Sequence, residues 1–152
     1  MTASARLAEL GLTLPPEATP AGNYQPAIRS GSYVYTSGQL PVVEGKLVAT
    51  GKVGGQVSPG DAHGYARVCA LNALAAIDAL VGLDAVAQVV KVVGFVASAD
   101  GFTGQPGVIN GASDLLAEVF GDAGRHARSA IGVAELPLGA PVEVELVVEL
   151  AT

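Results

Sequence analysis

The clearest pattern of hydrophobic and polar positions lies at the end of the chain, over residues 142–151. Apolar residues occupy every second position there, and three of the four positions between them are glutamates. Successive side chains of a β-strand point to opposite faces, so the alternation predicts a strand with one core face and one mixed face. The core face consists of Val142, Val144, Leu146, Val148 and Leu150, and the mixed face of Glu143, Glu145, Val147 and Glu149. The mixed face suits solvent or partial enclosure by another subunit.

Two further strands are predicted in the second half of the chain, before this last strand. Gln88–Ser98 is too continuously apolar for strict alternation, and its many valines favour a strand, so we expect it to be covered on both faces. The penultimate strand is expected over Ala127–Ala134. A turn through Pro137, Gly139 and Pro141 then joins it to the last strand.

Two helices are predicted from their start and stop signals. Ser58-Pro59-Gly60-Asp61 combines an N-cap, a proline at the first helical position and an acidic residue near the positive end of the helix dipole. This helix runs to about Val81 and stops at Gly82. The second is expected from near Pro106 to Gly121. The first helix is rich in alanine, which suits close packing on a sheet.

The N-terminal part of the chain predicts shorter elements. Residues 1–10 read as a short helix, and Thr13–Pro26 is a proline-rich, extended arm. Strands over Ala27–Arg29 and Tyr33–Ser37 form a hairpin, and a short strand is expected around Lys46–Ala49.

The order of these elements predicts a single α+β domain over residues 1–152, with two main helices packed on one face of a mixed β-sheet. The helix and arm at about residues 1–26 are an N-terminal extension of that domain.

The chain has few charges for its size. Charged residues make up 14% of its 152 residues, and the formal net charge is −6, whereas average globular proteins carry about 25% charged residues. We therefore expect part of the surface to be buried between subunits. The strand Gln88–Ser98 and the mixed face of the last strand locate that surface on the side of the sheet away from the helices.

Composition also argues against several classes of protein. Charged residues interrupt the apolar segments, so no membrane span is expected, and the first ten residues lack the features of a signal peptide. These observations favour a cytoplasmic protein. A single cysteine, Cys69, permits no internal disulfide, and His63 and His126 are too far apart in sequence to suggest a metal site. No metal or cofactor is expected.

Nucleic acid is not an expected partner. The densest basic group is only Arg125, His126 and Arg128, and the chain has no tryptophan. Generic catalytic motifs fail as well. The glycines at 45 and 51 are separated by five residues where a phosphate-binding loop needs four, and no Gly-x-Ser-x-Gly sequence occurs.

Two motifs remain, and they occur in a characteristic order. The first is Tyr33-Val-Tyr-Thr-Ser-Gly-Gln-Leu-Pro41. The second is Arg128-Ser-Ala-Ile-Gly-Val-Ala-Glu-Leu-Pro137, followed by Val142-Glu-Val-Glu145. With these motifs the chain resembles the RidA family, also called YjgF, from about Tyr24 to the C-terminus. The resemblance implies a chorismate-mutase-like fold and a homotrimer with sites in the clefts between subunits. It also implies cofactor-free hydrolysis of imines and enamines such as 2-aminoacrylate to 2-oxo acids and ammonia.

The resemblance assigns roles to six residues. Arg128 would bind the substrate carboxylate, because a guanidinium can donate two parallel hydrogen bonds to it. Glu143 would orient the attacking water or take its proton. The four residues implied to contact the substrate are Tyr24, Gly38, Asn110 and Ala130. Backbone groups near Gly38 and Ala130 would hold the nitrogen end.

Each assignment has an ordinary structural alternative. Arg128 could be an ion-pair residue, Glu143 part of a solvated stripe, and Asn110 a helix-surface residue. Tyr24 could simply fix the arm to the sheet, and Gly38 could serve only a bend.

Departures from the family pattern keep other functions open. Ala130 stands where close relatives of the founding enzyme have a cysteine. The alternative function is therefore a non-catalytic module that binds small carboxylic acids in the same cleft. The segment Ala99–Gly107 and the N-terminal arm are additions that could reshape the cleft. Ribonuclease activity, historically attached to the family, is disfavoured by the acidic charge and the lack of a histidine pair.

Three further residues have expected environments. Cys69 is predicted to be a buried small hydrophobe in a helix. Asn72 lies among apolar neighbours and should hydrogen-bond a nearby loop, because a buried unpaired amide costs about 1–3 kcal/mol. His126 is expected either in a solvated loop or at the rim of the cleft.

Overall fold

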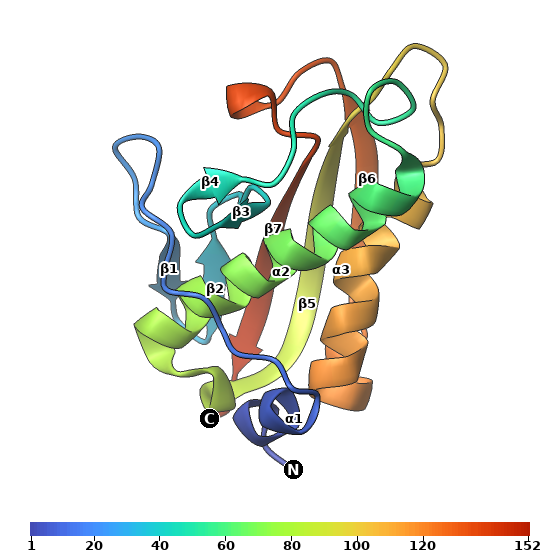
Figure 1. Cartoon of the computed structure of the whole chain (residues 1–152). Helices are drawn as coiled ribbons and strands as arrows, with labels where there is room; N and C mark the ends of the chain where they lie inside the picture. Colours follow the sequence, from blue (N-terminus) through green and yellow to red (C-terminus); the bar gives the residue numbers. More distant parts are fainter.

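The computed structural model describes all residues from Met1 to Thr152. A five-stranded sheet forms its centre, in the order β1-β2-β7-β5-β6, and β5 and β6 are the parallel pair. The strands are β1 (Ala27–Ser30), β2 (Tyr33–Thr36), β5 (Val86–Ala97), β6 (Ala127–Val133) and β7 (Val142–Leu150). Figure 1 shows this sheet behind two long helices, α2 (Pro59–Val81) and α3 (Gln105–Phe120). The predicted α+β class is confirmed.

The long helices begin and end where their capping signals predict. The Ser58 side chain accepts a hydrogen bond from the Asp61 backbone N at 3.1 Å, and Pro59 opens α2. Gly82 ends that helix with a positive φ of 83°, a conformation that glycine adopts without a steric penalty. Both helices pack on the same face of the sheet and on each other. At Gly111 an added Cβ would collide with the His63 carbonyl, so glycine permits the close approach of α3 to α2.

The last strand confirms the predicted alternation. The five apolar residues of β7 that point toward the helices are buried, and the four residues between them are half-buried. The helix-facing core also contains Val89, Val92 and Val96 from β5. The opposite side of the sheet, which we call the open face, is not covered within one chain. Its exposed apolar side chains are Ile28, Tyr33, Tyr35 and Ile131.

Smaller elements complete the domain. α1 (Ala3–Glu9) is anchored by Ser4, whose backbone N donates a hydrogen bond to Asp84 Oδ1 at 2.8 Å. The Ser4 hydroxyl also donates to Asp84 Oδ2, and this bond, with a smaller contribution from the backbone N–H, lowers the pKa of Asp84. The strands β3 (Val42–Val43) and β4 (Lys46–Leu47) form a separate hairpin, of which the sequence predicts only the second. Three short 3₁₀ helices follow the long elements: η1 (Leu83–Ala85), η2 (Gly121–Gly124) and η3 (Pro137–Gly139).

The predicted arm, Thr13–Pro26, has no helix or strand and crosses the helix side of the molecule. Figure 1 shows it running from α1 past α2 before it turns back into β1. Leu12 and Leu14 pack against the core at its beginning. The beginning of the arm is therefore docked on the domain, whereas residues 21–25 are exposed.

One expectation about membranes needs correction. The sequence predicts no segment that approaches a membrane span, yet α2 is long and apolar enough by length and composition, with a mean hydropathy of 1.4 over its most apolar stretch. The fold accounts for this composition, because ten residues of α2 are buried within the domain. Core helices of soluble proteins meet the same criterion.

Candidate functional site

Arg128 lies on the edge strand β6 and points to the helix side of the sheet. It pairs in register with Val92, which is fully buried under the helices. Its Nη1 donates hydrogen bonds to Asn110 Oδ1 at 2.7 Å and to Ser113 Oγ at 3.2 Å. Asn110 and Ser113 are three residues apart on α3 and so share one side of that helix. The remaining N–H groups of the guanidinium donate to no protein atom and are available to a ligand.

Ser113 is itself held by His126, which comes just before β6. Ser113 Oγ lies 2.8 Å from His126 Nε2, and His126 Nδ1 lies 2.6 Å from the Gly124 carbonyl oxygen. A carbonyl can only accept, so Nδ1 carries the proton, and in the neutral ring Nε2 accepts from the serine hydroxyl. The chain of bonds fixes Ser113, which in turn helps to fix Arg128.

Glu143 lies on the open face of the sheet. It pairs in register with Phe95 and alternates with the buried Val142 and Val144. Its carboxylate accepts no hydrogen bond from the protein. Burial, with a smaller contribution from the neighbouring charge of Glu145, raises the pKa of Glu143 above its ordinary value. Burial alone raises the pKa of Glu145. The open face thus holds two carboxyl groups that are poorly solvated when ionised.

Gly38 packs directly on Glu143. A Cβ at position 38 would lie 2.6 Å from Glu143 Oε1, so a larger residue would displace that carboxyl group. The missing side chain also leaves the backbone at Gly38 accessible beside the carboxylate. The φ of Gly38 is not in the left-handed region, so close approach rather than backbone freedom is the reason for glycine here.

The two residues expected to catalyse the reaction lie on opposite faces of one sheet. Arg128 is in register with Val92, and Glu143 with Phe95, three residues further along β5. A site that uses both groups on one substrate therefore needs a second copy of the chain.

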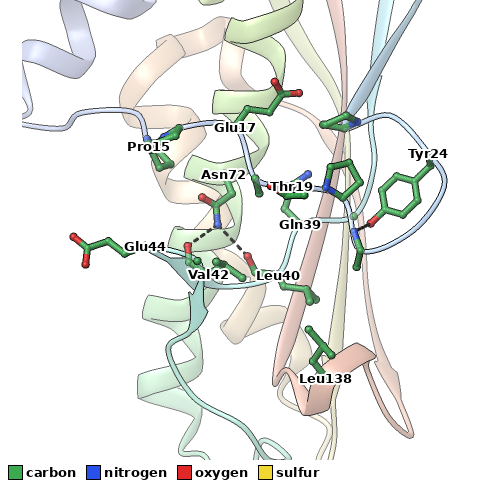
Figure 2. Close-up of a pocket in the computed structure, with 17 residues that line it drawn as sticks. Pro15, Glu17, Thr19, Tyr24, Gln39, Leu40, Val42, Glu44, Asn72 and Leu138 are labelled. Atoms are coloured by element: carbon green, nitrogen blue, oxygen red, sulfur yellow. Dashed lines mark hydrogen bonds between the residues drawn. The ribbon is translucent and has the colours of Figure 1, made fainter.

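The remaining predicted contact residues lie in two regions: beside Arg128 on β6, and at a cavity beneath the N-terminal arm. Ala130 is in register with Gly94 on the helix side, two residues after Arg128, and packs partly against the core. Tyr24 lies in the arm, about half exposed, and its Oη accepts a hydrogen bond from the Ala21 backbone N at 3.2 Å. Tyr24 and Gly38 both line a cavity of about 510 Å³ beneath the arm, which Figure 2 shows with its lining side chains.

The sequence did not identify Ser113, and it left His126 between a solvated loop and a cleft rim. The structure places His126 half-buried in the bonds that hold Arg128. The only signal for Ser113 is its spacing of three from Asn110 on a predicted helix. Polar residues at that spacing are common on helix surfaces, so the signal is weak.

No metal centre is visible. No group of three or more His, Cys, Asp or Glu side chains lies close enough to bind an ion. Cys69 is buried in α2, as predicted, and burial raises its pKa well above the ordinary value. A buried, protonated thiol is a poor nucleophile. Asn72 makes the predicted loop contacts, donating from Nδ2 to the carbonyl oxygens of Leu40 and Val42, each at 3.0 Å.

Comparison with known proteins identifies the family. A family model described as "YjgF/chorismate_mutase-like, putative endoribonuclease" matches residues 4–150. The chain belongs to the YjgF/RidA family. The Trypanosoma cruzi protein TCP17 is 46% identical, over 97% of this chain and 93% of its own length.

Solved structures of YjgF/RidA proteins show the same fold. The Agrobacterium tumefaciens protein Atu1372, described as having unknown function, is 45% identical with a TM-score of 0.90, covering 99% of this chain and 94% of its own. E. coli TdcF, crystallised with bound serine, is 26% identical with a TM-score of 0.66, covering 91% of this chain and 96% of its own. The present chain thus matches Atu1372 over nearly its whole length, including the arm, and TdcF over a smaller share.

Proposed function

We propose that this YjgF/RidA protein hydrolyses small imines and enamines that carry a carboxylate, such as 2-aminoacrylate after tautomerisation. The water oxygen bonds to the imine carbon and the carbon–nitrogen bond breaks. The nitrogen leaves as ammonia with the two hydrogens of the water and its own, and a 2-oxo acid remains. The two RidA motifs and membership of the YjgF/RidA family support this reaction class.

The observation that carries the proposal is the orientation of Arg128. Asn110 and Ser113 hold one of its terminal nitrogens on the helix side of β6, while the other N–H groups stay free. A guanidinium held in this way can bind a planar carboxylate through two parallel bonds and fix the adjacent imine carbon in place. Lysine, a point charge on a flexible stem, would fix position without orientation.

Glu143 is the group suited to the water. Its raised pKa brings the carboxyl group closer to the pH at which it can both accept and return a proton. It would take a proton from the attacking water and deliver one to the leaving nitrogen. Gly38 lets the Glu143 carboxyl group pack against the main chain at position 38, because any side chain there would collide with it.

A homotrimer would bring the two groups together. The open face exposes Ile28, Tyr33, Tyr35 and Ile131, and tyrosines with aliphatic residues are typical of subunit interfaces. Docking of this face between copies would bury the apolar groups and place Glu143 of one copy at an interface with the next. The site would then consist of Arg128, Asn110 and Ala130 from one chain and Glu143 and Gly38 from its neighbour.

Ala130 supports a second candidate, a non-catalytic module that binds small carboxylic acids. The position two residues after Arg128 supplies no thiol and so only its backbone can contact a ligand. If a thiol is needed for turnover, the cleft would bind carboxylates without converting them.

The deciding experiment generates imino acids in situ with an amino-acid oxidase and follows release of the 2-oxo acid. The hydrolase account predicts acceleration above the uncatalysed background. An absence of acceleration, together with protection against thermal unfolding by 2-oxo acids, would favour the binding module instead. A labelled RNA incubated in parallel should remain intact. Light scattering should give the mass of a trimer, and a stable monomer would remove the shared site.

A further inference from the structure

The N-terminal arm forms one wall of the cavity beneath it. One side is formed by the proline-rich arm, chiefly Pro15–Ala21, and the other by the loop after β2 and by Asn72 of α2. Figure 2 shows Thr19 of the arm beside Gln39 of the loop, with Tyr24 and Leu138 at the edges of the cavity and the Glu17 carboxylate pointing away from the loop. Its volume of about 510 Å³ is in the range that binds small molecules.

The lining excludes an anionic group. It contains no lysine, arginine or histidine, and its only charged side chains are those of Glu17 and Glu44. Prolines, alanines, Leu40 and Val42 provide much of the rest. A carboxylate placed here would meet two negative charges and no cation, whereas an uncharged and mainly apolar group would bury surface favourably.

Asn72 adds one polar requirement. Its side chain is 3% exposed, and both Nδ2 hydrogens are donated to Leu40 and Val42. The two carbonyl partners fix the amide orientation, so the oxygen and nitrogen cannot be exchanged. Oδ1 accepts no hydrogen bond from the protein, and Asn72 lines the cavity (Figure 2). No buried side-chain polar atom lacks a partner, so Oδ1 is accessible rather than buried, and it can accept a hydrogen bond from an occupant that offers N–H or O–H.

Leu138 lies at the rim of the cavity in an unusual state. It is 72% exposed and has a φ of 60°, in the left-handed region. A leucine in that conformation costs about 1–2 kcal/mol. The backbone strain and the exposed apolar side chain both cost free energy. Contact with an occupant of the cavity would bury it.

Gly38 lies between this cavity and the proposed catalytic carboxylate. It lines the cavity and packs on Glu143. An imine whose reacting carbon lies beside Glu143 could therefore extend its side chain past Gly38 into the cavity.

We propose that the arm cavity binds the substrate side chain, and that it selects imino acids with an extended, uncharged side chain ending in an N–H or O–H donor. This inference rests on the proposed imine hydrolysis and specifies its substrates. Arg128 of the neighbouring copy holds the carboxylate, the arm encloses the side chain, and Asn72 accepts from its end.

The test compares kcat/KM for imino acids generated from alanine, norvaline, methionine, glutamine and glutamate. Values should rise by roughly fourfold for each methylene buried in the cavity. Glutamine and glutamate side chains have nearly the same shape, so any difference between their imines reflects the negative charge and the loss of the N–H donor. We expect the glutamine-derived imine to react at least tenfold faster. Equal values for that pair, or no rise with length, would overturn the inference and leave imine hydrolysis standing.

A filled cavity provides the second arm of the test. Ala18→Trp, in the lining, should lower kcat/KM for the long substrates by about tenfold and leave the alanine-derived imine unchanged. Ala79→Trp, on the exposed side of α2, is the matched control. Equal losses for all substrates would contradict the assignment. Calorimetry with the corresponding 2-oxo acids measures the same preferences as binding. If no imine is hydrolysed, preferential binding of the long uncharged acids still supports the cavity, and equal binding rejects it.

Discussion

The two halves of the proposed site are stabilised in opposite ways. On the helix side, Arg128 is fixed within one chain by Asn110 and Ser113, and Ser113 by His126. On the open face, Glu143 accepts no hydrogen bond from its own chain, and both burial and Glu145 disfavour its charge. The binding half is therefore preorganised within a single chain. The reactive half costs the fold some stability.

This difference separates recognition from reactivity. A preorganised guanidinium loses little conformational freedom when it binds a carboxylate, so its contribution appears mainly as affinity. A carboxylate whose charge is disfavoured is more readily protonated, which suits proton transfer but destabilises the folded state at neutral pH. Substitutions in the two halves should therefore have opposite effects on stability.

Replacing the arginine should have the largest effect. Arg128→Ala removes two charge-assisted hydrogen bonds to the substrate carboxylate, so kcat/KM should fall by about 10²- to 10³-fold. The assay is 2-oxo acid release, with circular dichroism to confirm folding. Arg125→Ala is the matched control, because that exposed side chain makes only a 3.9 Å ion pair with Asp122. A loss of less than threefold for Arg128→Ala would show that the carboxylate binds elsewhere.

Glu143→Gln should separate activity from stability. Loss of the proton acceptor should lower kcat by about 10²-fold with little change in KM. The thermal midpoint at pH 7 should rise by roughly 1–3 °C, because the amide carries no poorly solvated charge. Glu149→Gln on the same face should change neither quantity much. A fall in the midpoint for Glu143→Gln would mean that the carboxylate is stabilised by contacts in the assembly.

Stability should also depend on pH through the same groups. The folded-state pKa values of Glu143 and Glu145 are raised, so the folded protein binds protons more tightly than the unfolded chain. Their effect favours folding as pH falls into the window between the unfolded and folded pKa values, and is lost as pH rises through that window. Thermal unfolding of the wild type against Glu143→Gln/Glu145→Gln across that window checks the sign. A wild-type midpoint that changes in parallel with that of the double variant would contradict it.

Ser113→Ala tests how far the arginine depends on its own chain. Without the hydroxyl, Arg128 keeps Asn110 but loses its second acceptor, so KM should rise by about threefold to tenfold while kcat changes little. Ser113→Thr keeps the hydroxyl and should restore most of the affinity. Equal KM values for the alanine and threonine variants would show that Ser113 does not orient the guanidinium.

The smallest expected effect belongs to Glu145→Gln. Removing this negative charge lowers the pKa of Glu143, since Glu145 raises it through charge repulsion. The acidic limb of the pH–rate profile should therefore move to lower pH, with the maximal rate preserved. A shift to higher pH would contradict the assignment of that limb to Glu143.

Sequence patterns predicted the elements well because each had a local physical cause. Ser58 and Gly82 cap α2, and the alternation in β7 reflects a sheet covered on one side. The face on which Arg128 lies could not be read, because β6 is an edge strand whose residues are all at least partly exposed and show no clear alternation. The path of the arm could not be predicted from the sequence either, because prolines disfavour a helix but do not specify which surface the segment packs on.

The most direct test of a site shared between copies is complementation. Arg128→Ala and Glu143→Gln are each expected to be inactive, and are unfolded together and refolded as a mixture. If each site takes its arginine from one copy and its glutamate from the next, chance assembly restores one half times one half, about a quarter, of wild-type activity. Activity no greater than that of the separate variants would contradict the shared site, since the two defects would then lie within the same functional unit.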